Sequence, residues 1–143
     1  MINFLLALFL SSNIFCECVT TDDVLLKSKP SSTSSTLWQV RKYMPLKIVK
    51  TTKDKRWTKV LDYSGSTYWV KKSILTNDYK CIVVTTVASS VRSGPGMNFP
   101  PKYKEPATKL ETFKFLQKQE NWVKYEDAYG DTGWLFAKHV WIN

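Results

Sequence analysis

The feature that most constrains this chain is an internal repeat with an offset of 65 residues. Shifting the sequence by this offset places Trp57 on Trp122 and Trp69 on Trp134. The shift superimposes further identical residues without a gap: Val19–Thr21 on Val84–Thr86, Ser28 on Ser93, Pro30 on Pro95, Lys59 on Lys124, Asp62 on Asp127, Gly65 on Gly130 and Thr67 on Thr132. Tryptophan is rare, so two such coincidences at one offset indicate duplication. The sequence therefore predicts a leader, residues 1–18, and two copies of one small domain, residues 19–77 and 81–143.

The leader has the features of a secretory signal peptide. Met1 to Phe15 is apolar and uncharged, and at about 1.5 Å per residue it is too short to span a membrane comfortably as a helix. No Lys or Arg precedes the apolar run, so a buried strand or an uncleaved anchor is the alternative. We expect export, to the periplasm or the cell envelope.

The cysteines leave the cleavage site and the pairing open. Cleavage after Cys18 would leave Cys81 as the only cysteine. Cleavage after Cys16 would instead leave Cys18 able to pair with Cys81 in an oxidising compartment. A nucleophilic Cys81 would need a neighbouring base, and the single histidine, His139, lies near the other end of the chain. We therefore predict no catalytic residue.

Each copy consists of short apolar and β-branched runs between turn signals, which is typical of strands. Strands are predicted at 24–27, 46–49, 57–61 and 68–70, and again at 81–87, 110–116, 122–126 and 133–136. No sustained helical periodicity is present, so long helices are not expected. Each copy has about 60 residues, near the lower limit for unaided folding. The predicted fold is all-β, with two small closed barrels that leave no exposed sheet edge.

Alternation along the strands assigns side chains to faces. It predicts four inward-facing residues, Val60, Val70, Tyr125 and Leu135, and it places the four repeated tryptophans on outer faces. Outer rings can stack on a ligand, but in so small a barrel they can instead fold over the core, which is the interpretation we favour for each. The candidate binding residues are the outer aromatic rings and one arginine: Trp57, Tyr68, Trp69, Arg92, Trp122, Tyr129 and Trp134.

The run Val91-Arg92-Ser93-Gly94-Pro95-Gly96, followed by Trp122-Val123-Lys124-Tyr125 and Gly133-Trp134-Leu135, resembles the bacterial SH3 (SH3b) family. The resemblance covers residues 83–142 well and residues 19–77 more loosely. The first copy has Lys27-Ser28-Lys29-Pro30 where the family usually has Arg-x-Gly-Pro, and Tyr68 where it usually has glycine. The resemblance implies two tandem SH3-like barrels and a non-catalytic role, typically the binding of cell-wall peptidoglycan or of proteins.

The net charge of +9 favours an anionic partner, although a lysine-rich surface also serves solubility. Residues 19–79 carry twelve basic and five acidic side chains (+7), and residues 80–143 carry nine and six (+3). We expect an exported module that binds peptidoglycan or another anionic envelope component. The alternative is a periplasmic scaffold for protein–protein interactions. Nucleic acid is disfavoured by the leader, and we expect Arg92 to bond carbonyls of its own loop rather than to contact a ligand. No metal or cofactor is predicted.

Overall fold

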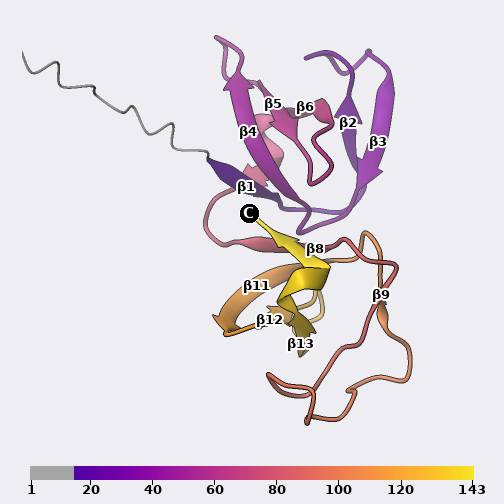
Figure 1. Ribbon diagram of the computed structural model, residues 1–143. Coiled ribbons are helices and arrows are strands. Elements are labelled where there is room, and N and C mark those ends of the chain that lie inside the picture. The colour runs from indigo at the N-terminus through magenta and orange to yellow at the C-terminus, as the bar shows by residue number, and fades with distance from the viewer. Residues whose placement is uncertain (1–14) are drawn as a thin grey trace, which may run out of the picture.

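The computed structural model describes residues 15–143, and these form two groups of antiparallel strands (Figure 1). The first group contains β1 (Cys16–Val19), β2 (Val24–Lys27), β3 (Thr36–Val40), β4 (Pro45–Thr51), β5 (Trp57–Leu61), β6 (Thr67–Lys71), the 3-10 turn η1 (Lys72–Ile74) and β7 (Leu75–Thr76). The second contains β8 (Cys81–Val84), β9 (Ala88–Ser89), β10 (Ala107–Thr108), β11 (Thr112–Gln119), β12 (Trp122–Glu126), β13 (Thr132–Phe136), η2 (Ala137–His139) and β14 (Val140–Ile142). We call them unit 1 and unit 2. The predicted all-β fold is confirmed, and no helix of residues 15–143 is long and apolar enough to cross a membrane.

The prediction that each sheet closes into a barrel is wrong. The sheet of unit 1 has the order β3-β2-β6-β5-β4-β1-β7, and that of unit 2 has the order β13-β12-β11-β8-β14, so both are open ladders. In unit 1, β2 joins β6 through a single residue pair, and the far edge strand β7 has only two residues. In unit 2, residues 93–106 form a proline-rich loop, and β13 is continued only by an isolated bridge between Trp134 and Arg92. Pro101 of this loop forms a second isolated bridge with Arg92. Proline lacks the N–H that a sheet ladder needs, so the loop adds no continuous strand to the sheet.

The two units share their strand pattern at the repeat offset. The bounds of β5, β6 and η1 recur 65 residues later in β12, β13 and η2. The fourth strand departs from this offset. Lys47 pairs with Leu61, whereas Lys114 pairs with Glu126, so β11 lies 67 residues after β4. Unit 2 has two more residues before this strand and two fewer in the hairpin after it. The alignment therefore contains a compensated gap, and the duplication itself stays a prediction.

Each unit has its own core, and the predicted inward residues lie in these cores. Val60, Val70 and Leu135 are fully buried and Tyr125 is 3% exposed. The residue paired with the core position across the neighbouring strand differs between the units. In unit 1 a small residue, Val60, lies opposite Tyr68; in unit 2 the large Tyr125 lies opposite Gly133.

The presence of Tyr68 instead of glycine is thus matched by a smaller residue on the neighbouring strand. The hydroxyl of Tyr68 donates a hydrogen bond of 3.1 Å to Asp62 Oδ2. A Cβ atom at Gly133 would lie 2.6 Å from Val91 Cγ1 and 2.8 Å from the hydroxyl oxygen of Tyr125. In unit 1 the tyrosine of this cross-strand pair, Tyr68, lies on β6. In unit 2 the tyrosine of the equivalent pair, Tyr125, lies on β12.

Strand β8 joins the two units, because it is buried on both faces. Ile82 and Val84 pack into the core of unit 2, whereas Val83 packs into the core of unit 1 together with Trp141. A disulfide connects Cys18 of β1 to Cys81 of β8. Figure 1 shows the C-terminus beside β1 at this junction, where the side-chain oxygen of Asn143 accepts a hydrogen bond of 2.7 Å from the backbone N–H of Cys81. The units are therefore docked rather than flexibly linked.

The first sheet starts before the predicted boundary of its domain. β1 begins at Cys16, three residues before position 19, and it pairs with both β4 and β7. Cleavage after Cys18 would remove most of this strand and one half of the disulfide. Cleavage after Cys16 keeps Cys18. The rest of the predicted leader, residues 1–14, lies outside the described residues.

The buried Tyr125 makes stability sensitive to alkaline pH. Burial, with smaller contributions from the charges of Asp127 and Glu111, raises the pKa of Tyr125 to about 12. The unfolded chain releases this proton near pH 10, so the contribution is fully present below pH 10 and is lost as the pH rises toward 12. We expect the free energy of unfolding to fall by about 1.4 kcal/mol per pH unit across this window through Tyr125 alone. Urea titrations at several pH values check this; Tyr125→Phe should remove that slope, and an unchanged slope in the variant contradicts the assignment.

Candidate binding face and grooves

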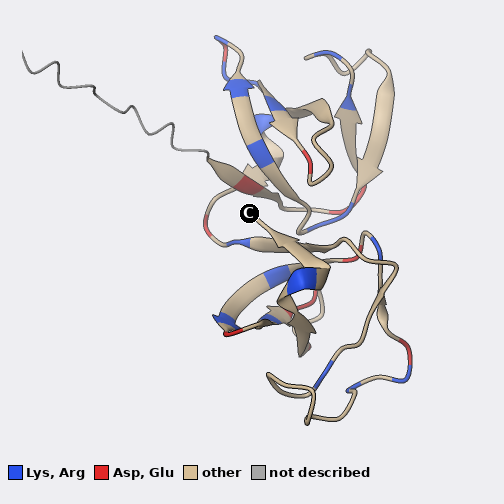
Figure 2. Ribbon diagram, in the orientation of Figure 1, with Lys and Arg blue, Asp and Glu red and all other residues tan. Residues whose placement is uncertain are grey.

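The outer face of unit 1 carries tryptophan and lysine side chains in register across four strands. Lys50 lies opposite Lys59, Lys59 opposite Trp69, and Trp69 opposite Lys27. Beside this row, Trp57 lies opposite Lys71. We call these six residues the basic face: Lys27, Lys50, Lys59, Lys71, Trp57 and Trp69. Figure 2 shows basic residues as blue bands on β2, β4 and β5.

The like charges of this arrangement destabilise the fold. Two like charges directly opposite each other on neighbouring strands, such as Lys50 and Lys59, destabilise a sheet. None of the strands β2, β4, β5 and β6 contains an acidic residue to offset them. The ammonium group of Lys50 lies 5.8 Å from the ring centroid of Trp69, within reach of a cation–π interaction. An external anion would relieve the repulsion that this face contains.

Lys27 also has a structural role. Its ammonium group donates hydrogen bonds to the carbonyl of Ser34 at 3.2 Å and to the hydroxyl of Thr36 at 2.8 Å, which holds the Ser-rich loop between β2 and β3. Among the described residues, the ammonium groups of Lys50, Lys59 and Lys71 make no hydrogen bond and no ion pair. These three are the lysines of the face that can meet a ligand.

The equivalent face of unit 2 is less basic and its rings are more buried. Gln117, Lys124, Trp134 and Arg92 occupy the corresponding row. Trp122 and Trp134 are each only 8% exposed. Phe136 stands where unit 1 has Lys71, and its ring lies 5.5 Å from that of Trp122. In unit 2 the rings therefore shield the core, whereas Trp57 and Trp69 of unit 1 are only partly buried.

A groove of about 300 Å³ lies at the corresponding place in each unit. Both grooves are built around the first tryptophan of the repeat, with a cationic residue beside it. Six positions, related by the offset of 65, line both grooves: Leu25, Lys27, Ser32, Trp57, Lys71 and Ile74 in the first, and Ser90, Arg92, Met97, Trp122, Phe136 and His139 in the second. Thr21 to Val24 complete the first groove.

The two grooves differ in chemistry. In the second, Arg92 Nη1 donates hydrogen bonds to the carbonyls of Met97 at 3.3 Å and Phe99 at 2.7 Å, so this guanidinium holds its own loop. His139 Nδ1 lies 2.9 Å from Ser89 Oγ, and its ring packs edge-on against Phe136. In the first groove, Lys71 keeps a charge beside Trp57. Asp22 and Asp23 also line the first groove and balance Lys27 and Lys71, so the charge of its lining does not favour an anionic ligand over the second groove.

The seven predicted binding residues do not form one site. Trp57 and Trp69 share the basic face, and Arg92, Trp122 and Trp134 lie together on unit 2. Tyr68 packs on the core of unit 1, where burial and then the charge of Asp62 raise its pKa. Tyr129 lies apart, on a turn that faces unit 1, and is 97% exposed.

The lysines that share the face with these tryptophans were not among the predicted binding residues. The signal was present, because Lys59 directly precedes Val60, which was predicted to face inward, and alternation therefore places Lys59 on the outer face. The turn at residues 62–66 fixes the pairing of Trp57 with Lys71 and of Lys59 with Trp69. Applying the pairing to every lysine of β4, β5 and β6 would have found the face.

The described residues provide no evident catalytic centre. No group of three or more His, Cys, Asp or Glu side chains in residues 15–143 is placed to hold a metal ion. Cys81 is bonded to Cys18, so it has no thiol that can act as a nucleophile. What the arrangement can do is bind, through lysine charge and the partly exposed rings of Trp57 and Trp69.

The described residues form a small all-β, SH3-like fold, and unit 1 carries the basic face. Residues 21–77 match the family model described as bacterial SH3 domain. The match falls on the copy whose motifs resemble the family more loosely. No curated protein matches the chain.

Solved structures similar to the chain include NlpC-type proteins and an endolysin domain. NlpC2 from Trichomonas vaginalis has 11% identity and a TM-score of 0.37, with 90% of this chain and 48% of that chain covered. An NlpC/P60 family protein from Bacillus cereus has 12% identity and a TM-score of 0.38, with 90% and 56% covered. The domain named Endolysin LysPBC5 CBD has 17% identity and a TM-score of 0.35, with 91% and 94% covered. The chain thus spans about half the length of the two NlpC-type proteins.

Proposed function

We propose that the protein is an exported, non-catalytic module that binds cell-wall peptidoglycan or another anionic polymer of the cell envelope. The observation that carries this proposal is the row Lys50–Lys59–Trp69 on the unit that matches the bacterial SH3 domain model. Wall polymers present carboxylates or phosphates next to sugar rings. Lysines can pair with the former, and half-buried tryptophans can stack on the latter.

The disulfide supports export. Disulfides form and persist in oxidising compartments and are rare where thiols are kept reduced. The bond between Cys18 and Cys81 has both sulfurs fully buried at the junction of the units. We propose that the leader is removed no later than Cys16, which leaves β1 nearly complete and the disulfide intact.

The binding should depend on salt and on the charges of the basic face. Charge reversal of Lys50 and Lys59 to Glu replaces attraction by repulsion, and we expect retention on purified sacculi to fall about tenfold or more at low salt. Lys109→Glu with Lys118→Glu is the matched control, because it makes the same change in net charge on exposed residues of unit 2. A co-sedimentation assay with both double variants measures the effect.

Equal losses in the two variants would contradict a specific face, and unchanged retention in the face variant would contradict the proposal. Sacculi stripped of phosphate-containing polymers separate the two kinds of target. Retention on stripped sacculi indicates peptidoglycan carboxylates, and retention only on untreated walls indicates the phosphate polymer. If the wild-type protein is not retained on either kind of sacculi but cross-links to one envelope protein, the result would instead support the alternative function, a periplasmic scaffold for protein–protein interactions.

A further inference from the structure

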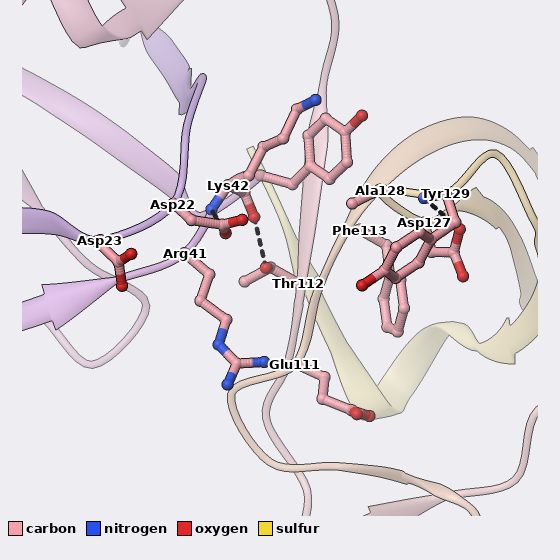
Figure 3. Close-up of a pocket in the computed structure, with 11 residues that line it drawn as sticks. Asp22, Asp23, Arg41, Lys42, Glu111, Thr112, Phe113, Asp127, Ala128 and Tyr129 are labelled. Carbon is pink, nitrogen blue, oxygen red and sulfur yellow. Dashed lines mark hydrogen bonds between the residues drawn. The ribbon is translucent and has the colours of Figure 1, made fainter.

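A cleft of about 420 Å³ lies between the two units (Figure 3) and shares Asp22 and Asp23 with the first groove. Unit 1 contributes one wall and unit 2 the other. Its lining is mixed, with carboxylates, two cationic residues and aromatic rings: Asp22, Asp23, Arg41, Lys42, Tyr43, Glu111, Thr112, Phe113, Asp127, Ala128 and Tyr129. Clefts of this size between domains are frequent ligand sites.

The walls of the cleft are held in place relative to each other. The hydroxyl of Thr112 in unit 2 donates a hydrogen bond of 2.6 Å to the carbonyl of Lys42 in unit 1, as the dashed line in Figure 3 shows. The Cys18–Cys81 disulfide and the shared strand β8 fix the same junction. The cleft is therefore formed before any ligand arrives, which lowers the entropy cost of binding.

Tyr129 is the most unusual residue of the lining. It stands at the tip of the turn between β12 and β13, where Asp127 Oδ1 accepts hydrogen bonds of 2.9 Å from the backbone N–H groups of Tyr129 and Asp131. Unit 1 has the same turn, in which Asp62 Oδ1 accepts from the N–H groups of Ser64 and Ser66. Ser64 occupies the tip there, so this turn needs no aromatic side chain in order to form. An aromatic ring that is 97% exposed beside a cleft is thus available for a ligand.

The polar groups of the cleft are held by the backbone and still have bonding capacity. Asp22 Oδ1 accepts from the N–H of Lys42, and Glu111 Oε2 accepts from the N–H of Thr108. The second oxygen of each of these carboxylates, and of Asp127, accepts no hydrogen bond from the described residues. The guanidinium of Arg41 makes no hydrogen bond and no ion pair among residues 15–143, and Figure 3 shows it extending toward Glu111. Fixed acceptors, a free donor and an exposed ring are complementary to a sugar, whose hydroxyls donate and accept while its C–H face stacks on an aromatic ring.

The charge of the lining distinguishes this cleft from the basic face. Four carboxylates against Arg41 and Lys42 give a formal charge of −2, in a protein whose net charge is +9. A phosphate or carboxylate polymer would be repelled here. We propose that the cleft binds a neutral glycan segment, with one sugar ring stacked on Tyr129 and its hydroxyls bonded to Arg41 and Asp127.

The site is tested by titrating tri-N-acetylglucosamine, a soluble neutral glycan, into the full chain and following amide chemical shifts; the choice of this sugar rests on the proposed function. We expect saturable shifts around the cleft. Tyr129→Ala should weaken binding about tenfold by removing the stacking surface. Tyr129→Phe is the matched control, because it keeps the ring, and it should bind like the wild type. Arg41→Ala should weaken binding severalfold.

The basic-face variant with Lys50→Glu and Lys59→Glu should bind the trisaccharide normally, so failure of the cleft and failure of the basic face can be told apart. No saturable shift with the wild-type chain, or full affinity in Tyr129→Ala, would overturn the proposal. Binding of spermidine in place of the glycan would also overturn it, since that result would make the cleft a site for ammonium groups.

Discussion

Replacing Cys18 and Cys81 together by serine is expected to lower the free energy of unfolding by about 4 kcal/mol. The disulfide closes a loop with a sequence separation of 63 residues, and opening a loop of that length returns considerable chain entropy to the unfolded state. Urea unfolding of the oxidised wild type and of the double variant, followed by tryptophan fluorescence, measures the difference. A change below about 1 kcal/mol would show that packing alone holds the units together.

In the full chain, which retains residue 16, Cys16 supplies the matched control for this experiment. It lies in the same strand as Cys18, is only partly buried and forms no disulfide. Burial raises the pKa of its thiol, which therefore stays protonated at neutral pH. Cys16→Ser should change the free energy of unfolding by less than about 0.5 kcal/mol, typical of a surface substitution. Reduction of the wild type should lower the free energy of unfolding by as much as the double substitution does. Reduction of the Cys16→Ser variant should lower it by the same amount.

The strand pattern and the inward faces were predictable because they depend on local alternation. Val60, Val70 and Leu135 could be assigned to the core because each alternates with outward-facing residues along its strand, and the structure places them there. The union of the two units was not predictable in the same way. Cys18 and Cys81 do not occupy equivalent repeat positions, and Val83 enters the core of the other unit. Such contacts depend on how the folded units pack against each other, and the local sequence pattern of either unit does not predict this packing.

The candidate site shows the same limit. Trp57 and Trp122 are equivalent in sequence, yet only Trp122 is shielded, because Phe136 packs against it where unit 1 has Lys71. Exposure of a ring is decided by its cross-strand neighbour as much as by its own position. The arginine was easier to assess. Arg92 precedes a loop rich in glycine and proline, whose backbone carbonyls need donors, and it bonds two carbonyls of that loop.

Gly133→Tyr alone is expected to destabilise unit 2 by about 3 kcal/mol or more. Even a Cβ atom at this position would approach Val91 and the ring of Tyr125 to within 3 Å, and both neighbours are buried core residues. Tyr125→Val alone should cost about 2–4 kcal/mol, because it leaves a cavity where the ring was. Chemical unfolding of each single variant, monitored by tryptophan fluorescence, measures these losses.

The two substitutions combined should recover most of the loss. The double variant recreates in unit 2 the pairing of Val60 with Tyr68 found in unit 1. Asp127 stands where Asp62 accepts the hydroxyl of Tyr68, so the introduced hydroxyl also has a partner. We expect a favourable coupling energy of about 2 kcal/mol or more in the double-mutant cycle. Additive losses would mean that the two units fill their cores by unrelated solutions, whereas rescue would show that one fold accepts the same volume from either of two neighbouring strands.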